Sequence, residues 1–478
     1  MSAVIWFRQD LRLSDNPALR AALAGSGAVI PVYIHAPGEE GAWAPGGASR
    51  WWLHHSLAAL KDELRSRGSD LIVRASDDSA AELLRIARAS GANRVLWNRR
   101  YEPAAIARDA RIKTWLRQQG LEAESYNASL LREPWELKTK TGGPYQVFTP
   151  FWRQSLMLGD PPKPLPAPRR IPAPDRWPDS CAASEFALLP QLDWAHGLRK
   201  TWKPGAAAAL TRLKTFLDSG LREYPRARDR PDLAGTSCLS PHLHFGEISP
   251  RQIWHEVRIN AADRAPDPRW RESRFLTEIG WREFSHHLLY HFPETVGAPL
   301  RPAYARFPWL DSANHLRAWQ RGRTGYPIVD AGMRQLWHTG WMHNRVRMIV
   351  ASFLVKHLLI NWTSGARWFW DTLVDADLAS NTLGWQWSAG CGADAAPYFR
   401  IFNPMSQGRK FDESGNYVRR WVPEIARLSN NWIHEPWAAP EKELRQEGIT
   451  LGKDYPAPIV DHSRARAAAL AALATLKN

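Results

Sequence analysis

The sequence predicts two domains, an α/β domain with a parallel sheet followed by an all-α domain. Its 478 residues exceed what one hydrophobic core ordinarily organises. Short apolar runs alternate with helical patterns near the start, and the pattern after about residue 204 is helical to the end. We therefore expect an α/β domain over residues 1–130, a connector over 131–203 and a helical domain over 204–478.

Four β-rich runs in the first domain alternate with four helical patterns. The runs are residues 2–8, 28–35, 70–75 and 94–100, and the helical patterns are 16–25, 49–68, 79–91 and 103–120. This alternation predicts a doubly wound, Rossmann-like parallel sheet. No G-x-G-x-x-G opens the first helix, so the ordinary dinucleotide fingerprint is absent, and Asp15 or Asn16 can cap that helix before Pro17.

Proline separates the two patterns. Eight of the nineteen residues from 160 to 178 are Pro, which excludes a helix or a central strand and indicates an inter-domain connection. The helical patterns that follow are residues 204–221, 249–259, 274–291 and 329–359, with a plain terminal helix expected over 465–477.

Composition favours a nucleic-acid partner in a reducing compartment. Lys and Arg number 63 against 48 Asp and Glu, a net charge of +15 that suits a polyanion, although a generally basic surface would give the same balance. Three scattered cysteines, Cys181, Cys238 and Cys391, form neither a disulfide framework nor a zinc spacing. Charges interrupt the N-terminus where a signal peptide needs an apolar stretch, and no apolar run approaches the ~20 residues of a membrane span. We expect a cytoplasmic protein.

The stretch GTSCLSPHLHFGEISP (235–250) places small hydroxyl residues in a loop before a helix. Hydroxyls and free N–H groups at a helix start suit a phosphate, but the same residues are typical of ordinary caps. His242 and His244 alternate as metal ligands can, yet no third ligand of suitable spacing is evident, so we expect no metal.

Two helical segments place polar and aromatic residues on one face each. In TEIGWREF, the spacing of Glu278, Trp281 and Arg282 fits a base-binding site or a surface salt bridge beside a core Trp. In WMHNRVRM, Asn344, Arg347 and Met348 share a helical face.

The segment VDAD brings together two carboxylates, Asp375 and Asp377. They suit metal or acid–base chemistry, or an ion pair with Arg347.

Tryptophan is abundant, with 26 residues against 11 Tyr. A chain of indoles can relay an electron between a buried cofactor and the surface. The candidates are Trp309, Trp362, Trp385 and Trp387, although packing explains any single one of them.

Taken together, these stretches resemble the photolyase/cryptochrome flavoproteins. The resemblance runs from WFRQDLRLSDNPAL near the start to YVRRWVPEIARL and the C-terminal helices. Its most specific parts are GTSCLSPHLHFGE, RTGYPIVDAGMRQL, TGWMHNRVRM and DADLASNTLGWQW. It implies an α/β antenna domain followed by a helical domain that holds a U-shaped FAD, which would explain the missing fingerprint in the sheet domain.

The resemblance implies a flavin site and an electron relay. Asn381 resembles the amide that faces the reducible nitrogen of the central flavin ring. Trp385, Trp362 and Trp309 match a three-Trp relay, in that order outward from the flavin. The expected FAD contacts are Tyr224, Thr236, Ser237, Cys238, Leu239, Ser240, Asn344, Arg347, Asp375, Ala376, Asp377 and Asn381.

The same resemblance implies a lesion pocket for UV-damaged DNA. Glu278 resembles the carboxyl that hydrogen-bonds the pyrimidine of the dimer, and Trp281 and Trp387 resemble the pair that sandwiches the flipped lesion. The other expected DNA contacts are Arg228, Arg282, Asn344, Met348 and Gln407.

The implied enzyme is a deoxyribodipyrimidine photo-lyase. Reduced FAD would absorb blue light and pass an electron to a cyclobutane pyrimidine dimer, the ring would split, and the electron would return. Six-four enzymes resemble this chain but carry a proton-shuttling His in the segment and at the place of Asn344. An amide cannot shuttle a proton, and His343 points ~100° away around a helix. We therefore expect cyclobutane dimers to be the substrate.

A cryptochrome-type light-signalling receptor is the main alternative, because SRWWLHHSLAAL, SPHLHFGEIS and FWDTLVDADL look close to plant cryptochromes. Those receptors carry Asp at the place of Asn381, and their pattern lacks Glu278, Trp281 and Trp387; this chain also has no long tail after the helical domain. The combination resembles the class III bacterial photolyases. A plain nucleic-acid-binding protein would explain the charge but not the flavin motifs.

Resemblance to class III implies 5,10-methenyltetrahydrofolate as an antenna in the first domain. The family's better-known folate pattern is only partly kept, and the expected contacts are Glu102 and Trp43, with the Gly46–Gly47 loop nearby. We expect a monomer.

Overall fold

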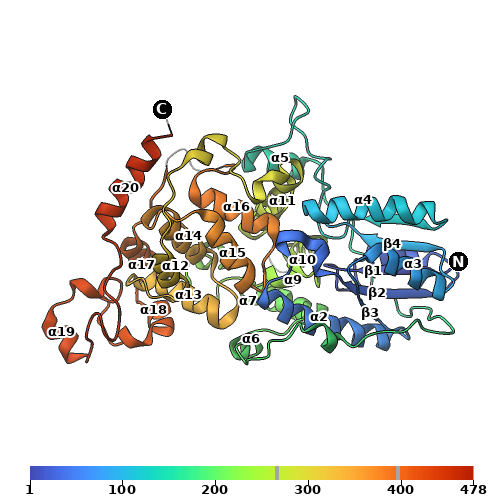
Figure 1. The fold of residues 1–478 in the computed structure, drawn as a ribbon, viewed down its shortest axis with the longest axis horizontal. Coiled ribbons are helices and arrows are strands. Elements are labelled where there is room, and N and C mark those ends of the chain that lie inside the picture. The colour runs from blue at the N-terminus through green and yellow to red at the C-terminus, as the bar shows by residue number, and fades with distance from the viewer. Residues whose placement is uncertain (264–267, 395–398, 477–478) are drawn as a thin grey trace.

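The structure is a computed structural model that describes residues 1–263, 268–394 and 399–476. An α/β domain lies at one end and a larger helical domain at the other, with the N-terminus in the first and the last helix at the far edge of the second (Figure 1). The predicted fold class is confirmed.

One parallel sheet organises the α/β domain. Among the described residues its order is β3-β2-β1-β4-β5, with bounds β1 Ala3–Phe7, β2 Val29–His35, β3 Ile72–Ala75, β4 Arg94–Asn98 and β5 Glu122–Tyr126. Four strands match the predicted runs. Strand β5 was not predicted, because it is a polar edge strand in which only Ala123 is fully buried.

Helices cover both faces of this sheet. Helices α1 (Pro17–Leu23) and α2 (Gly47–Ser66) pack on one face, and α3 (Ser79–Ala89) and α4 (Pro103–Gln118) pack on the other. Asn16 is the cap of α1, because its side-chain oxygen accepts from the N–H of Leu19 at 3.0 Å. Asp15 instead accepts from the Ser249 hydroxyl at 2.5 Å and so ties the first domain to the second.

The connector packs on both domains. Ile171 is fully buried in the core beneath α1 and α2, and the N–H of Val29 in β2 donates to the Pro172 carbonyl at 2.8 Å. Helix α5 (Phe148–Met157), which was not predicted, packs with α11 of the helical domain. The proline-rich segment therefore contains neither a helix nor a strand, as predicted, and it is packed into the folded body.

The helical domain begins after the short helix α6 (His196–Thr201). Its helices are α7 Ala206–Ser219, α8 Tyr224–Ala227, α9 Ser240–His244, α10 Pro250–Asp263, α11 Arg274–His291, α12 Ala313–Gln320, α13 Pro327–Thr339, α14 Asn344–Ser352, α15 Trp362–Thr372, α16 Leu378–Ala389, α17 Pro404–Phe411, α18 Asn416–Trp421, α19 Glu441–Gln446 and α20 His462–Ala474. The predicted terminal helix is α20; its expected last residue, Lys477, lies outside the described residues.

The helical pattern over 329–359 divides into three elements. Helix α13 ends at Gly340, whose φ of 66° is a left-handed value that favours glycine. Helix α14 begins four residues later behind the cap His343 and runs into a π-helix, η6, over Phe353–His357. A periodic apolar pattern does not show such a break, because both sides of it face the same core.

The Glu247 carboxylate joins three separate segments in the interior. It accepts from the Trp52 indole at 3.0 Å and the Ser56 hydroxyl at 2.6 Å, both on α2, and from the N–H of Gly205 at 2.8 Å. It also bonds to the ring of His242 on α9. This residue fixes α2 and α9 against each other. Because the loop of residues 235–239 leads directly into α9, it is fixed as well.

Candidate functional site

The loop before α9 presents unpaired backbone donors. Gly235 is required there, because a Cβ would lie 2.6 Å from Ala227. Cys238 has a φ of 50°, which turns the chain into α9. Within the described part of the chain, no acceptor meets the backbone N–H groups of residues 236–239. Unpaired backbone N–H groups of this kind suit an anionic oxygen such as a phosphate.

One wall of the site runs from this loop to an ion pair. The Trp341 indole donates to the Ser240 hydroxyl at 3.2 Å, and the Arg347 guanidinium lies 5.9 Å from the Trp341 ring. Arg347 is paired with Asp375 at 3.0 and 2.8 Å, as expected. Burial raises the pKa of the Cys238 thiol, and the charges of Asp375 and Arg347 also act on it, so the loop and the pair lie together.

A second buried pair starts helix α16. Asp377 caps it by accepting from the N–H of Ser380 at 2.7 Å, and His286 of α11 lies 3.4 Å from the carboxylate. Burial alone would raise the pKa of Asp377, but the positive charges of His286 and Arg282 hold it well below its usual range. Burial likewise works to lower the pKa of His286, but Asp377 raises it above its ordinary value.

Asn381 lies one turn after Asp377 and is half-buried. Its side-chain nitrogen donates to the Ala366 carbonyl of α15 at 3.0 Å. The amide is therefore held by one of its two N–H donors, and its oxygen is left to accept a hydrogen bond from a ligand.

A chain of charges links α11 to α14 through residues 228 and 229. Glu278 pairs with Arg228, Arg228 lies 3.9 Å from Asp229, and Asp229 pairs with Arg345 at 2.8 Å. Sequence reasoning assigned Glu278 and Arg228 separately and missed Arg345. Nothing in their spacing along the chain shows that these side chains meet.

The two tryptophans of the expected lesion pocket pack against different parts of the protein. Trp281 stacks on Phe148 of α5, with ring centroids 3.8 Å apart and planes 9° apart. Trp387 and Met348 line one small cavity together with the buried Lys356. Among the described residues, no ring contact joins Trp281 to Trp387. Sequence reasoning missed Phe148, which lies in the connector.

Arg282 faces the interior and not an external phosphate. Its guanidinium donates to the Ser129 carbonyl at 2.7 Å, and 13% of the side chain is exposed. Trp281 is one residue earlier and so lies about 100° around the helix. Contrary to the expectation, Arg282 is therefore not placed to contact a phosphate. Its side chain instead binds the segment that connects the two domains.

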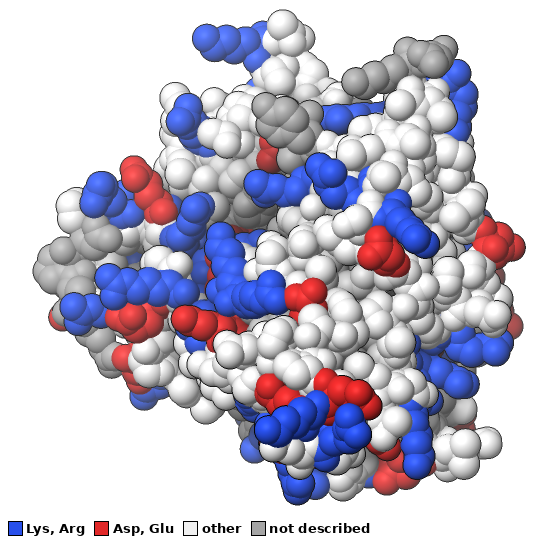
Figure 2. Space-filling view, turned by 90° about the vertical axis from the view of Figure 1, so that its left-hand side faces the viewer, with Lys and Arg blue, Asp and Glu red and all other residues white. Residues whose placement is uncertain are grey.

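The remaining expected contacts divide into residues on α14 and α17 and residues that are buried. Asn344 is exposed at the start of α14, and Gln407 lies on α17, whose Phe411 ring carries the guanidinium of Arg345 at 4.5 Å. Tyr224, Leu239 and Ala376 are buried. Figure 2 shows a face of the protein on which Lys and Arg side chains gather around a hollow, as a polyanion requires.

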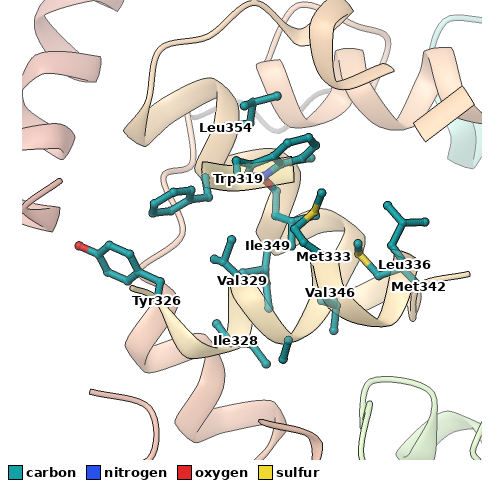
Figure 3. Close-up of a cluster of buried hydrophobic side chains, with 14 of the residues drawn as sticks. Trp319, Tyr326, Ile328, Val329, Met333, Leu336, Met342, Val346, Ile349 and Leu354 are labelled. Atoms are coloured by element: carbon teal, nitrogen blue, oxygen red, sulfur yellow. The ribbon is translucent and has the colours of Figure 1, made fainter. Parts of the chain in front are cut away.

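The three tryptophans expected to form the relay range from buried to partly exposed. Trp385 and Trp362 are buried in the largest core cluster, and Trp309 packs against its edge half-buried. Trp319, which sequence reasoning did not single out, contacts Trp385 edge to face at 6.1 Å and belongs to the same cluster (Figure 3). A Cβ on Gly365 would meet the Trp385 ring at 2.1 Å, so this glycine makes room for the indole.

A second cavity, larger than the one that Trp387 and Met348 line, lies between the two domains. Its lining includes Trp43 and Trp370, whose rings meet edge to face at 5.3 Å, and the guanidinium groups of Arg8, Arg100 and Arg108. The carboxylate of Glu102 forms an ion pair with the guanidinium of Arg100, with an N–O distance of 3.1 Å.

The glycines expected near the antenna serve domain packing. A Cβ on Gly46 would come 2.4 Å from Asp371, and the N–H of Gly47 donates to the Asp371 carboxylate at 2.8 Å. They hold α2 against α15.

Two classes of site are not found in the described parts of the chain. No group of three or more His, Cys, Asp or Glu side chains there is arranged to hold a metal ion. No helix there has the length and apolar character needed to cross a membrane.

Two family models match the chain. Residues 3–169 match DNA photolyase, and residues 275–475 match the FAD binding domain of DNA photolyase.

Individual proteins match over nearly the whole chain. A deoxyribodipyrimidine photo-lyase from Agrobacterium fabrum is 52% identical over 99% of this chain and 98% of its own length. Cryptochrome-1 from Arabidopsis thaliana is 44% identical over 97% of this chain and 69% of its own length. The crystal structure of a bacterial class III photolyase from Agrobacterium tumefaciens is 51% identical with a TM-score of 0.96, covering 100% of this chain and 98% of that one.

The Asp377–His286 pair generates a stability prediction. Asp377→Asn keeps a capping side chain but leaves His286 buried without its counter-charge, so the free energy of unfolding should fall by about 3–5 kcal/mol. Because the pKa of His286 is raised in the folded state, its contribution is complete below its unfolded pKa and is lost as pH rises through the folded pKa. The loss measured by urea unfolding should therefore be larger at pH 6 than at pH 9.

The matched control is Asp461→Asn, which changes the same cap type on the exposed start of α20. It should stay within about 0.5 kcal/mol of the parent protein. Equal losses at both positions, or no pH dependence at Asp377, would show that the pair does not stabilise the fold.

Proposed function

The chain belongs to the photolyase/cryptochrome family, and from that premise we propose that it repairs UV-damaged DNA by light-driven splitting of cyclobutane pyrimidine dimers. The observation that carries the proposal is that the chain has all four residues expected to form the lesion pocket. Glu278 and Trp281 lie on α11, and Met348 and Trp387 line one cavity from α14 and α16. A plant-cryptochrome pattern lacks three of these four residues.

The residues of the site fit FAD. The unpaired N–H groups of residues 236–239 suit its phosphates, and the Arg347–Asp375 pair supplies a fixed polar wall beside them. The oxygen of Asn381 is left to accept from the flavin ring. When bound and reduced, FAD supplies on absorbing blue light the electron that opens the dimer.

On the lesion side, a carboxyl and a guanidinium lie where we expect negative charge to develop on the pyrimidine. Arg228 holds the Glu278 carboxyl, which we assign to the pyrimidine, and its guanidinium brings a positive charge close to the base that gains the electron. Trp281 and Trp387 supply flat surfaces for a dimer that has left the duplex. Arg345 and the basic end of α17 provide charge for the phosphates beside it.

The environment of His343 favours cyclobutane dimers over six-four photoproducts. This His is buried, and its ring nitrogen accepts from the N–H of Arg345 as the cap of α14. Burial lowers its pKa to about 4, so it is neutral at pH 7 and poorly suited to protonate a lesion. Asn344 beside it has no ionisable group.

The family also contains light-signalling receptors, and Asn381 favours repair over that role. A carboxyl at this position could donate a proton to the flavin, whereas the Asn381 amide, bonded to Ala366, cannot. A cytoplasmic location and a monomeric state remain predictions.

For the antenna, we propose 5,10-methenyltetrahydrofolate in the cavity that Trp43 lines. The indoles of Trp43 and Trp370 offer flat surfaces for a pterin. Arg8, Arg100 and Arg108, each already paired with an acidic side chain, form a polar wall beside them.

The antenna proposal is tested by absorbance. After folate addition, the purified protein should absorb in the near ultraviolet beyond its flavin. Trp43→Ala should lose that band while Trp135→Ala, at an exposed indole outside the cavity, keeps it. A protein that shows flavin absorbance alone under all conditions would contradict the antenna proposal.

The repair proposal is tested with two oligonucleotides, one carrying a cyclobutane dimer and the other a six-four photoproduct. The reduced protein should restore the first under blue light and leave it unchanged in the dark, and it should leave the second unchanged in both conditions. Efficient six-four repair with little dimer repair would reverse the lesion assignment, and no repair of either would favour signalling.

The relay assignment is tested by Trp385→Phe. Photoreduction of oxidised flavin should fall at least about tenfold, because the flavin-side donor is gone, while repair by chemically pre-reduced protein should persist. Trp97→Phe is the matched control, since Trp97 is also fully buried with an unpartnered N–H but lies in the α/β domain. Normal photoreduction in the Trp385 variant would exclude this residue from the relay.

A further inference from the structure

A cleft on the helical domain lies outside the flavin and lesion sites. It encloses about 710 Å³ and is bordered by residues of α12, α13, α15 and α18. That volume is within the range of small-molecule sites. None of the residues assigned above to FAD, the relay, the lesion or the antenna lines it.

Aromatic rings form much of its lining. Trp337 and Trp368 stack with centroids 6.0 Å apart and planes 6° apart, and Trp421 and the buried Met333 complete this surface. Met333 projects from α13 into the core cluster shown in Figure 3. Trp337 is 59% exposed, more than any other Trp in the described chain. Such a ring, left open beside another, marks a surface that receives a flat ligand.

Two guanidinium groups on the rim are available to an anion. Arg317 and Arg321 are exposed one turn apart at the end of α12, and no hydrogen-bond or ion-pair partner meets either side chain among the described residues. Arg334 is different, because it is held by Glu424 at 2.7 Å and by the Gly322 carbonyl at 3.0 Å. No Asp or Glu of the described chain lines the cleft.

From these features we propose that the cleft binds a nucleoside phosphate. The indoles of Trp337 and Trp368 would take the base by stacking, and Arg317 and Arg321 would take the phosphates. A purely apolar ligand would leave both cations unused, and an inorganic anion would leave the open rings unused.

The experiment is calorimetric titration of ADP into the FAD-loaded protein, so that the flavin site is already filled. ADP should bind, and adenosine should bind at least about tenfold more weakly. Trp337→Ala and the double variant Arg317→Gln/Arg321→Gln should each weaken ADP binding by about tenfold or more. Arg323→Gln, an exposed arginine on the adjacent loop that does not line the cleft, should leave it unchanged.

Repair activity separates this proposal from the proposed function, because these variants should repair dimers at the parental rate and dimer-containing DNA should not displace ADP. No measurable ADP binding at millimolar concentration would overturn the proposal. Equal affinity in the parent and both cleft variants, or displacement by damaged DNA, would do so too. If undamaged single-stranded DNA binds here and ADP does not, the cleft is a nucleic-acid contact instead.

Discussion

The arrangement of the site depends on the hydrogen bonds of the buried Glu247 carboxylate. A buried carboxylate is costly unless its oxygens are hydrogen-bonded, and its donors come from α2, from the N–H of Gly205 before α7 and from His242 on α9. Satisfying it forces the α/β domain and the start of the helical domain into one relative position. The loop of residues 235–239 leads directly into α9, so its unpaired N–H groups are placed by the same constraint.

Charged pairs between helices then give the site its walls. The Arg347–Asp375, His286–Asp377 and Arg228–Glu278 pairs each join two elements distant in sequence. Low dielectric strengthens each pair and makes an unpaired partner costly, so the walls are held before any ligand arrives. This preorganisation suits a reaction in which the protein contributes position and electrostatics while a cofactor supplies the chemistry.

The structural features that could be predicted from the sequence are those that follow a periodic pattern or belong to a motif. Four of the five strands, the helices of the first domain and the Arg347–Asp375 pair followed from periodicity, motif or family resemblance. Strand β5 did not, because an edge strand buries too little to show an apolar pattern. Phe148 beneath Trp281 and the interior bond of Arg282 also did not, because they depend on contacts with segments more than a hundred residues away.

Electrostatics distinguishes Trp385 from other buried indoles. Trp6, Trp97 and Trp385 share a buried N–H without a partner among the described residues. Arg8 and Arg108 lie 4.3 and 5.0 Å from the Trp6 ring, and Lys113 lies 5.5 Å from Trp97, whereas the rings against Trp385 are those of Trp319 and Phe369. An indole that gives up an electron becomes positive, and a cation a few ångströms away in a low dielectric would oppose that loss. Burial alone therefore does not mark an electron donor in this chain, but burial among neutral rings beside α15 and α16 does favour one.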